Sequence, residues 1–501
     1  MSNSIKRYFR RHPLRTQRGL EMLPGIFSWT LILFPIWGSF LVPNLVAYYV
    51  ITFAVYWVFR SFSLATLALS AHFTIKASSK YDWIKDLNQH YGSTWRKVHH
   101  LIIIPTYQEP LETLERTLQS LSQQTIPLAN IHIMLSFEER EGDAAKQKAR
   151  YLTKKFSNTF GNVWTTLHPD IKDEVKGKSA NTNWGAQRAN EFIVNNPSIN
   201  SDLVTVTSED ADACFHPSYF ANVTFDFLSA EKPYNLIWQG AIVFYNNIWK
   251  VPAPIRVIAA VFSVTQMYIL KRSDRLINFS TYTTTLRHIR EINFWDTDVI
   301  PEDYRLFFKS YFAKKGQFWA RPIFLPIYAD AAEAKGMKQT FINQYEQLKR
   351  WAWGVSDDAY IIRQFVLSDE IPFWDKTIRV LKTIEDHFLW PVNWFAITIA
   401  AFFPPLLNPE FGRTILGKTL PQVTSTLLTL SLVSMVVIFL IDALNRPPKP
   451  GGRNAFSWIL QPLEFLLLPV LGFFFSALPG LDAHTRLLLG KYIEYRVTEK
   501  V

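Results

Sequence analysis

The chain has 501 residues, of which 48% are hydrophobic and 15% aromatic, a rich apolar content for a soluble enzyme. The net charge of +11 fits loops that face anionic lipid better than a nucleic-acid surface, because the sequence has neither a zinc-finger spacing nor a long basic tract. The single cysteine, Cys214, excludes intrachain disulfides and CxxC metal sites. Nucleic acid is therefore not an expected partner, whereas membrane lipid is.

The N-terminal region, residues 1–70, combines a basic tail with a long apolar stretch. Residues 22–59 carry no charge, which is too long for one membrane crossing, since about 20 residues span the hydrocarbon core. Pro43 and Asn44 indicate a turn near the middle of this stretch. We therefore expect two membrane helices, near 25–42 and 45–66, and the basic tail places the N-terminus in the cytoplasm.

Residues 97–360 change to alternating strand and helix patterns. Short apolar, β-branched runs predict strands at 101–104, 131–135, 163–167 and 203–207, with a helix at 111–122. Such β-α-β alternation predicts an α/β domain with a mostly parallel sheet covered by helices. Ligands of such sheets bind beyond the carboxyl ends of the strands. The polar segments that follow three of these strands are therefore expected to share one nucleotide-binding crevice.

The second half of this domain begins with an ambiguous segment, 251–270. It is nearly apolar enough for a membrane span, but Arg256, Gln266 and two prolines argue against one. A span here would also place Asp210 and Asp303 on opposite sides of the membrane. We expect an amphipathic helix at the interface or packed on the domain. Strands at 279–285 and 317–327 and a helix at 338–355 are predicted to follow.

The C-terminal part of the chain is again apolar. An amphipathic helix at 370–385 is expected on the membrane surface, followed by about three membrane helices within 386–481. The stretches 388–409 and 419–441 are uncharged, and the basic loop 445–453 should be cytoplasmic. The third stretch, 454–481, is interrupted by prolines and a glutamate. A single span there would put the basic tail, 482–501, outside the cell, whereas its positive charges favour the cytoplasmic side. A broken or re-entrant hairpin would reconcile these two arguments.

Three short motifs in the central domain carry chemistry. Asp210 and Asp212 stand one residue apart at a strand exit, where both can face one hard divalent cation such as Mg2+ or Mn2+. Glu302 and Asp303 precede a predicted helix, whose N-terminus favours a carboxylate. Taken alone, the Asp-X-Asp pair has an ordinary alternative, a solvated loop.

The third motif is Gln347-Leu348-Lys349-Arg350-Trp351. Its amide, guanidinium and indole groups lie three and four residues apart and share one helix face. This combination suits a sugar diphosphate, because an arginine can bind a phosphate with two parallel hydrogen bonds. Ordinary helix packing is the alternative for Trp351.

The order of these three motifs resembles the membrane-embedded glycosyltransferases of family 2, which include cellulose, chitin and hyaluronan synthases. The resemblance covers residues 98–360 and implies a GT-A-like domain inserted between transmembrane helices. It further implies a multi-pass protein of the plasma (inner) membrane with a cytoplasmic catalytic domain. The implied reaction is inverting transfer of a sugar from a UDP-sugar, or else a GDP-sugar, to an acceptor hydroxyl, making a β-linked polysaccharide.

The resemblance also assigns roles to residues of this chain. Asp303 is the expected catalytic base, and Asp210 and Asp212 are the expected metal ligands. Of the two, Asp212 is preferred as the direct ligand. Glu302 and Trp351 are expected to bind the acceptor. Expected donor-binding residues are Thr106, Glu109, Glu138, Lys178, Asp210, Gln347 and Arg350.

Two points leave parts of this assignment open. Lys178 can alternatively belong to a solvated basic turn before a helix. Many relatives carry an Asp that contacts the nucleobase after the second strand, whereas this chain has Phe137-Glu138-Glu139-Arg140, so the base is not identified.

Two other functions remain compatible with the sequence. One is a single transfer of sugar to a polyprenyl phosphate or lipid acceptor with the same residues. The other is an inactive membrane scaffold or transport component. The acceptor is accordingly a carbohydrate or a lipid, and a partner for export is compatible with each function.

Overall fold

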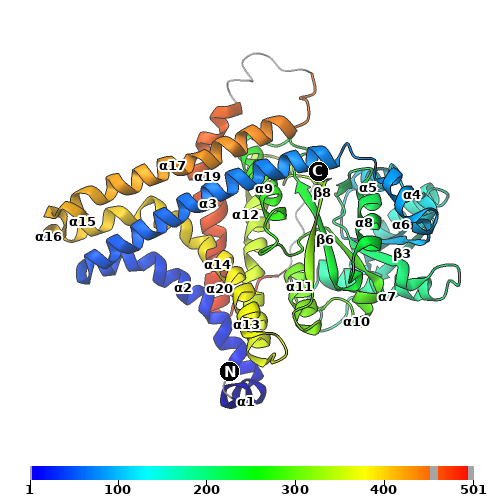
Figure 1. Cartoon of the computed structure of the whole chain (residues 1–501), viewed down its shortest axis with the longest axis horizontal. Coiled ribbons are helices and arrows are strands. Elements are labelled where there is room, and N and C mark those ends of the chain that lie inside the picture. Colours follow the sequence, from blue (N-terminus) through cyan, green and yellow to red (C-terminus); the bar gives the residue numbers. More distant parts are fainter. Residues whose placement is uncertain (1–2, 452–460, 495–501) are drawn as a thin grey trace.

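The computed structural model describes residues 3–451 and 461–494 of the chain. An eight-stranded mixed sheet lies at one end, and long helices extend from it (Figure 1). Parts of the predicted stretch 454–481 and of the basic tail lie outside the described residues. The strands are β1 (His99–Thr106), β2 (Ile131–Glu138), β3 (Asn162–His168), β4 (Val204–Ser208), β5 (Cys214–Phe215), β6 (Leu236–Val243), β7 (Tyr282–Thr285) and β8 (Trp319–Tyr328).

The strand order is β3-β2-β1-β4-β7-β6-β8-β5, and the first four strands are parallel. Strand β7 joins this half to β6 by antiparallel pairing on both sides, and β6 and β8 are again parallel. The predicted α/β class with a mostly parallel sheet is confirmed. Strand β7 is shorter than the predicted 279–285, because residues 279–281 leave the sheet and turn toward the cavity described below.

Alternate residues of β1 reach opposite faces of the sheet, as the period of a strand requires. Leu101 and Ile103 pack with α7 (Lys178–Val194) and α9 (Ala253–Leu270), whereas Ile102 and Ile104 pack with α5 (Leu111–Leu121) and α6 (Asp143–Phe156). Both sets are buried, which explains the continuous apolar run in the sequence. The remaining helices of this domain are α4 (Trp83–Tyr91), α8 (Tyr219–Ser229), α10 (Leu286–Glu291), α11 (Glu302–Ala313), α12 (Met337–Ala352) and α13 (Asp358–Leu367).

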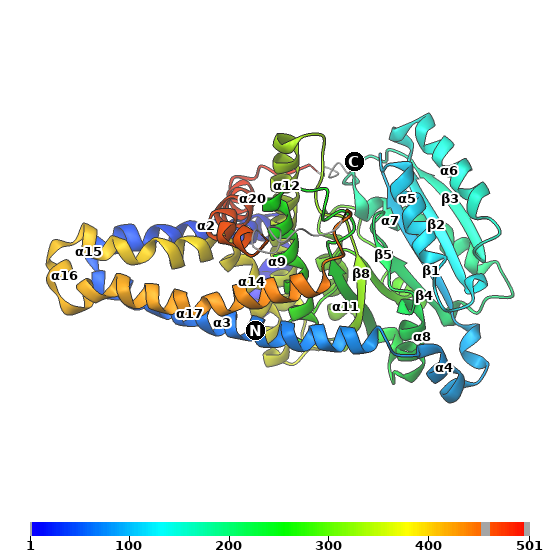
Figure 2. The ribbon, with the colours of Figure 1, turned by 90° about the horizontal axis from the view of Figure 1, so that it is seen from above.

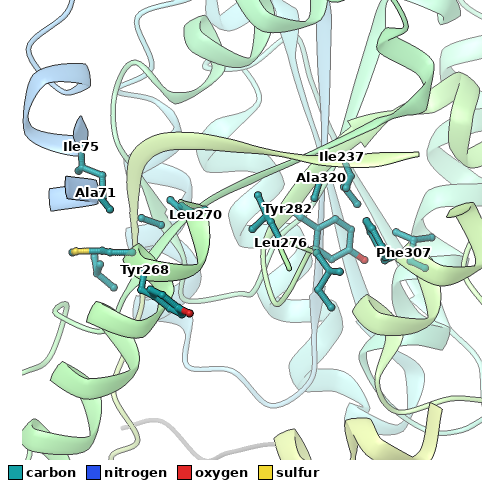
Figure 3. Packing of buried hydrophobic residues seen from close by; sticks show 14 of the residues in the cluster. Ala71, Ile75, Ile237, Tyr268, Leu270, Leu276, Tyr282, Phe307 and Ala320 are labelled. Atoms are coloured by element: carbon teal, nitrogen blue, oxygen red, sulfur yellow. The ribbon is translucent and has the colours of Figure 1, made fainter. Parts of the chain in front are cut away.

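Helix α9 is the ambiguous segment 251–270, and it packs against the sheet. Its length and apolar character alone would suit a membrane span, yet over half of its most apolar window is buried inside the protein. Figure 3 shows Tyr268 and Leu270 of α9 between Ala71 and Ile75 of α3 (Pro43–Ser78) on one side and the sheet on the other. The buried face of α9 therefore belongs to the core of the domain.

Within residues 3–451 and 461–494, five helices are long and apolar enough to cross a membrane, and counting the bent pair α14 (Phe373–Thr398) and α15 (Phe403–Leu407), at 47°, as one span raises this to six. Figures 1 and 2 show α2 (Pro13–Leu41), α3, α15 and α17 (Ile415–Asn445) extending side by side away from the sheet. The turns after α2 and before α17 lie at the same far end. The chain is thus compatible with a multi-pass membrane protein. Short helices α1 (Asn3–Arg11) and α16 (Pro409–Arg413) flank this set.

The C-terminal helical segment takes a different direction. The segment that contains α19 (Leu468–Gly472) and α20 (Leu478–Leu489) runs across α17 and α3 in Figure 1 and is seen nearly end-on in Figure 2. It packs on α2 and α12. A helix in this direction is not parallel to the other long apolar helices.

Two predicted helix boundaries differ from the structure. Helix α3 continues beyond the predicted end at residue 66 to Ser78, because Ala68, Ala71 and Ile75 are buried in the core of the domain. The predicted surface helix 370–385 is not separate from the next stretch, because α14 runs unbroken from Phe373 to Thr398. The charges near its middle are paired with neighbouring elements, as described below, so the helix need not end there.

Candidate active site

All residues that the sequence singles out line one cavity of about 420 Å³. They reach it from different elements: the ends of β1 and β2, the turn after β4, and the first turns of α7 and α11, with α12 opposite. The residues are Thr106, Glu109, Glu138, Lys178, Asp210, Asp212, Glu302, Asp303, Gln347, Arg350 and Trp351. The strand-end rule for parallel sheets explains why the first six converge. The individual roles assigned above stay predictions.

Asp210 is held from three directions. Its Oδ1 lies 2.6 Å from Lys178 Nζ, and its Oδ2 accepts a hydrogen bond from the Ser280 hydroxyl. Its backbone N–H donates to Thr281 Oγ1 at 3.0 Å. The segment after α9 therefore fixes this carboxylate at the exit of β4.

Asp212 is almost fully buried at the wall of the cavity. Its Oδ2 accepts the backbone N–H of Asp330 at 2.8 Å. The Asp330 carboxylate also lines the cavity and receives Arg116 Nη2 at 2.7 and 2.8 Å. Arg116 on α5 thus holds the turn that positions Asp212. Neither Asp330 nor Arg116 belongs to a motif that the sequence could reveal.

Lys178 lies at the start of α7, between the two pairs of acidic residues. Its Nζ contacts Asp210 at 2.6 Å and Glu302 Oε1 at 3.1 Å, and donates to the Ser280 carbonyl. Burial by itself lowers the pKa of this ammonium, but Asp210 and Glu302 outweigh it, and the pKa lies well above its ordinary value. Lys178 is therefore a permanent positive charge shared by both acidic motifs.

Asp303 lies in the first turn of α11, where backbone N–H groups have no intrahelical partners. Its Oδ1 accepts the N–H of Tyr304 at 2.8 Å, and its Oδ2 accepts the N–H of Ser280 at 3.2 Å. Burial raises its pKa, against the lowering effect of Lys178 and the backbone hydrogen bonds. Ser280, with a left-handed φ of 56°, thus contacts both Asp303 and Asp210.

Glu302 precedes Asp303 in sequence and has a distinct environment. Its pKa is raised to about 7, chiefly by burial and also by the nearby Asp303 and Asp210, against the lowering effect of Lys178. Near neutral pH this carboxyl therefore exchanges a proton readily. Because Glu302 lies beside Asp303, the net charge of the site changes with pH in the neutral range.

Glu209 is a buried carboxyl that the motif analysis did not single out. Both of its oxygens lack a hydrogen-bond partner among the described residues. Burial raises its pKa well above the ordinary value, and Asp210 and Asp212 add to the shift. This shift favours the neutral carboxylic acid form of Glu209 beside Asp210 and Asp212.

The loops after β1 and β2 meet beside Glu138. Arg140 forms an ion pair with Glu138, and its guanidinium carbon lies 3.9 Å from the centre of the Tyr107 ring. Tyr107 and Glu138 both line the cavity. The aromatic ring of Tyr107 can stack on a nucleobase, and the carboxylate of Glu138 can accept hydrogen bonds from N–H groups of that base.

Trp351 both lines the cavity and packs within the protein. Its ring lies 5.0 Å from that of Phe262 in an edge-to-face arrangement and 6.0 Å from that of Phe244. The two interpretations of Trp351 from the sequence are therefore not exclusive. Gln347 receives a hydrogen bond from Gln344 at 3.3 Å and, with Arg350, lies on the cavity side of α12.

The acidic residues of the cavity are suited to a hard divalent cation. No group of three or more His, Cys, Asp or Glu residues that could hold a metal occurs within residues 3–451 and 461–494. Mg2+ is commonly bound by one or two carboxylates together with substrate phosphates and water. Asp212 and Asp210 supply such a partial oxygen set, so these residues fit an ion whose remaining ligands come from a diphosphate.

No model of a protein family matches the chain, and the search of curated proteins gives no match. Similar solved structures include the mannosyltransferase PcManGT from Pyrobaculum calidifontis with GDP-Man and Mn2+, at 16% identity over 79% of this chain and 99% of that chain, TM-score 0.44. TarS 1–349 from S. aureus with UDP-GlcNAc has 12% identity over 80% and 93%, TM-score 0.36. GalNAc-T7 with UDP, GalNAc and Mn2+ has 14% identity over 64% and 58%, TM-score 0.31.

Proposed function

We propose that the chain is a metal-dependent, inverting glycosyltransferase of the membrane-embedded family-2 type, with a GT-A-like catalytic domain. The observation that carries this proposal is the meeting of the three motifs in one cavity. The Asp210–Asp212 pair, the Glu302–Asp303 pair and Arg350 line the same space although they come from β4, α11 and α12. Ser280 and Lys178 connect the first two pairs directly.

Each residue has a role that its contacts support. Asp303 accepts the proton of the acceptor hydroxyl while that oxygen attacks the anomeric carbon of the donor sugar. The bond from this carbon to the diphosphate breaks, and the diphosphate leaves with the electron pair. Arg350 and Lys178 provide positive charge for the leaving diphosphate. Asp212 and Asp210 would hold a Mg2+ or Mn2+ ion, which would supply further positive charge at the diphosphate. One displacement inverts the anomeric centre and needs no covalent intermediate.

The donor is a UDP-sugar or a GDP-sugar. Thr106, Glu109 and Glu138 line the part of the cavity beside Tyr107, where we place the nucleoside. Glu302 and Trp351 line the acceptor side. A β-linked polysaccharide is the proposed product, and transfer of one sugar to a lipid or polyprenyl phosphate is the second candidate, because the same residues would perform it.

The common direction of the long helices supports insertion in a membrane, which we propose is the plasma (inner) membrane. We propose that α2, α3, the α14–α15 pair and α17 cross it, and that α9 and α20 do not. Four crossings leave both ends of the chain on the side of the sheet. The basic helix α1 and the basic sequence after α17 support a cytoplasmic position for that side. An in-plane α20 would reconcile the basic tail with the third apolar stretch.

The test is the release of nucleoside diphosphate by purified protein in nanodiscs, across a panel of UDP- and GDP-sugars with Mg2+ or Mn2+. We expect release with one donor, and a loss of about 10²–10⁴-fold in Asp303→Asn. Asp298→Asn is the matched control, because Asp298 is an exposed carboxylate in the loop before α11 (72% exposed side chain). Equal rates in Asp303→Asn and wild type would reject Asp303 as the base. No release with any donor from folded protein would favour the scaffold function.

A further inference from the structure

One irregular segment, residues 271–281, supports both acidic motifs of the cavity. It connects α9 to β7 and contains neither a helix nor a strand, so its position depends on the contacts that it makes. Ser280, near its end, has a left-handed φ of 56°. A residue other than glycine keeps such a strained conformation only where its surroundings hold it. The contacts at the two ends of the segment therefore decide where Ser280 lies.

The C-terminal end of the segment contacts the carboxylates directly. The backbone N–H of Ser280 donates to Asp303 Oδ2 at 3.2 Å, and the Ser280 hydroxyl donates to Asp210. Thr281 Oγ1 accepts the backbone N–H of Asp210 at 3.0 Å. Asn278 Nδ2 donates to the Asp303 carbonyl at 3.1 Å. A shift of this end would therefore move the proposed base and a proposed metal ligand together.

The N-terminal end of the segment is bound to α14. Arg275 contacts Asp386 at 2.8 Å and Glu385 at 2.6 Å. Its Nη1 also donates to the Lys382 carbonyl at 3.2 Å, and the Lys382 ammonium pairs with Asp274 at 2.7 Å. Only 9% of the Arg275 side chain is exposed, so solvent screens its ion pairs little. The segment is thus fixed to α14 by buried charge.

Helix α3 binds the same two carboxylates of α14. Arg60 contacts Asp386 at 3.1 Å and Glu385 at 3.9 Å. The Tyr56 hydroxyl donates to Glu385 as well. Helices α3 and α14 both belong to the set proposed to cross the membrane. The ion pairs therefore join the packing of two membrane helices to the segment that ends beside the catalytic carboxylates.

The part of the segment between its two ends is buried. Leu276, Ile277 and Asn278 all lie in the interior. The backbone N–H of Phe279 donates to Gln239 Oε1 at 2.9 Å. Close-packed interiors have low compressibility and transmit strain, so a buried and hydrogen-bonded segment carries a displacement from one end to the other.

We propose that Arg275 is a positioning residue, which couples the packing of α3 against α14 to the placement of Asp303. The two carboxylates of α14 fix Arg275, and the rest of the segment transmits this position to the Ser280 N–H. The inference rests on the proposed function only for the role of Asp303 as the base. The membrane helices then do more than anchor the domain, because the rate of transfer depends on how they pack.

The test variants are Glu385→Gln and Arg60→Gln, because neither residue lines the cavity and any effect on the reaction is indirect. Asp386 is left unchanged, since it does line the cavity. Glu464→Gln and Arg256→Gln are the matched controls. They break another partly buried Arg–Glu pair, which joins α9 to the C-terminal helical segment.

The first measurement is hydrogen exchange at the backbone N–H groups of residues 276–281, in nanodisc protein without donor. It requires no activity. We expect exchange to be about tenfold faster in both test variants, because a loosened segment opens more often, and to remain at the wild-type rate in both controls. Unchanged exchange in the test variants would overturn the coupling.

The second measurement is transfer kinetics at saturating metal. Misplacing a reacting group by about 1 Å can cost about 10²-fold in rate. We expect kcat to decrease about 10–100-fold in Glu385→Gln, with KM for donor and acceptor within about twofold of wild type. Arg60→Gln should show a smaller decrease, because Arg60 acts on the segment only through the carboxylates of α14. Both controls should keep the kcat of wild type.

Three results would contradict the positioning role or the function on which it rests. A change in KM alone would assign the test residues to substrate binding instead. An equal loss of kcat in the controls would assign the effect to a general loss of stability. If wild type released no nucleoside diphosphate but the difference in exchange were present, the proposed function would be rejected and the coupling between helices and segment would remain.

Discussion

Lys178 Nζ lies 2.6 Å from Asp210 Oδ1 in a site where the lysine is largely buried. The same ammonium lies 3.1 Å from Glu302, so one positive charge stabilises both acidic motifs before any metal binds. A donor diphosphate that enters the cavity therefore meets a cation whose position is already fixed. Because the ammonium is already in position, it does not need to reorient in order to stabilise charge during the reaction.

Replacing Lys178 with Met should destabilise the protein and weaken donor binding. Removing one partner of a buried charge pair costs about 3–5 kcal/mol, because the remaining charges are left buried. Since Lys178 lowers the pKa of both Glu302 and Asp303, its loss favours their protonated forms. The decrease in Tm should therefore be larger at pH 8 than at pH 6. Thermal unfolding in detergent measures it, with Lys176→Met as the exposed control; an equal decrease in the control would contradict the prediction.

The pH dependence of transfer should reflect the raised pKa of Asp303. The base must be ionised, so kcat/KM should increase with pH through a value above that of an ordinary aspartate. Glu302, with a pKa of about 7, adds negative charge near Asp303 as it ionises. Glu302→Gln removes this charge and should move the acidic limb of the profile to lower pH. A profile of kcat/KM from pH 4.5 to 9 measures the shift, and an unchanged limb would show that the two carboxyls do not interact.

Glu302 also links stability to pH with a definite sign. Its folded pKa is raised above the unfolded value, so the stability it contributes is fully present below pH of about 4.5. That contribution is lost as the pH rises through about 7. The free energy of unfolding of wild type relative to Glu302→Gln should therefore decrease between these values. Urea unfolding of both proteins at several pH values provides the comparison, and a constant difference would be the contrary result.

The cavity was predictable where it depends on strand ends and helix faces. Asp210 and Asp212 follow a buried strand, and the exits of parallel strands meet at one edge, so local patterns suffice. Ser280 and Asp330 lie 70 and 118 residues from the carboxylates that they contact. Their positions depend on how the segment after α9 and the end of β8 return to the sheet, and no local spacing encodes this.

The boundary predicted within α14 differs from the structure. A surface helix was predicted at 370–385 and membrane helices from residue 386. In the structure Arg60 and Arg275 pair with Glu385 and Asp386 at this boundary, and α14 continues without a break. A sequence shows the charge on one helix but not the partners that neighbouring elements bring to it.

Removing divalent metal should abolish nucleoside diphosphate release. Chelation with EDTA should reduce the rate to background, and Mn2+ or Mg2+ should restore it, because Asp210 and Asp212 provide only part of a coordination shell. Asp212→Asn should raise the metal concentration for half-maximal rate. A titration of rate against metal concentration tests both, and full activity in EDTA would reject a metal at this site.

The Arg116–Asp330 pair should control how well Asp212 holds the metal. Arg116 does not line the cavity; it binds the Asp330 carboxylate, and the Asp330 backbone N–H in turn holds Asp212. Loss of such an outer hydrogen-bond partner typically reduces metal affinity about 10–100-fold. Arg116→Gln should therefore raise the metal concentration for half-maximal rate, with a much smaller change in kcat at saturating metal.

Arg321→Gln is the matched control for Arg116→Gln. Arg321 forms an Arg–Asp pair with Asp226 at the same 2.7 Å distance and with a similarly exposed arginine, although Asp226 is more exposed than Asp330; this pair lies at the start of β8 rather than its end. The control should lose a comparable amount of stability, because both pairs are partly exposed to solvent. Its metal dependence should remain that of wild type, since Asp226 does not contact the turn that holds Asp212. If both variants shifted the metal titration equally, a general loss of stability would explain the effect. If neither did, the backbone hydrogen bond from Asp330 would hold Asp212 without help from Arg116.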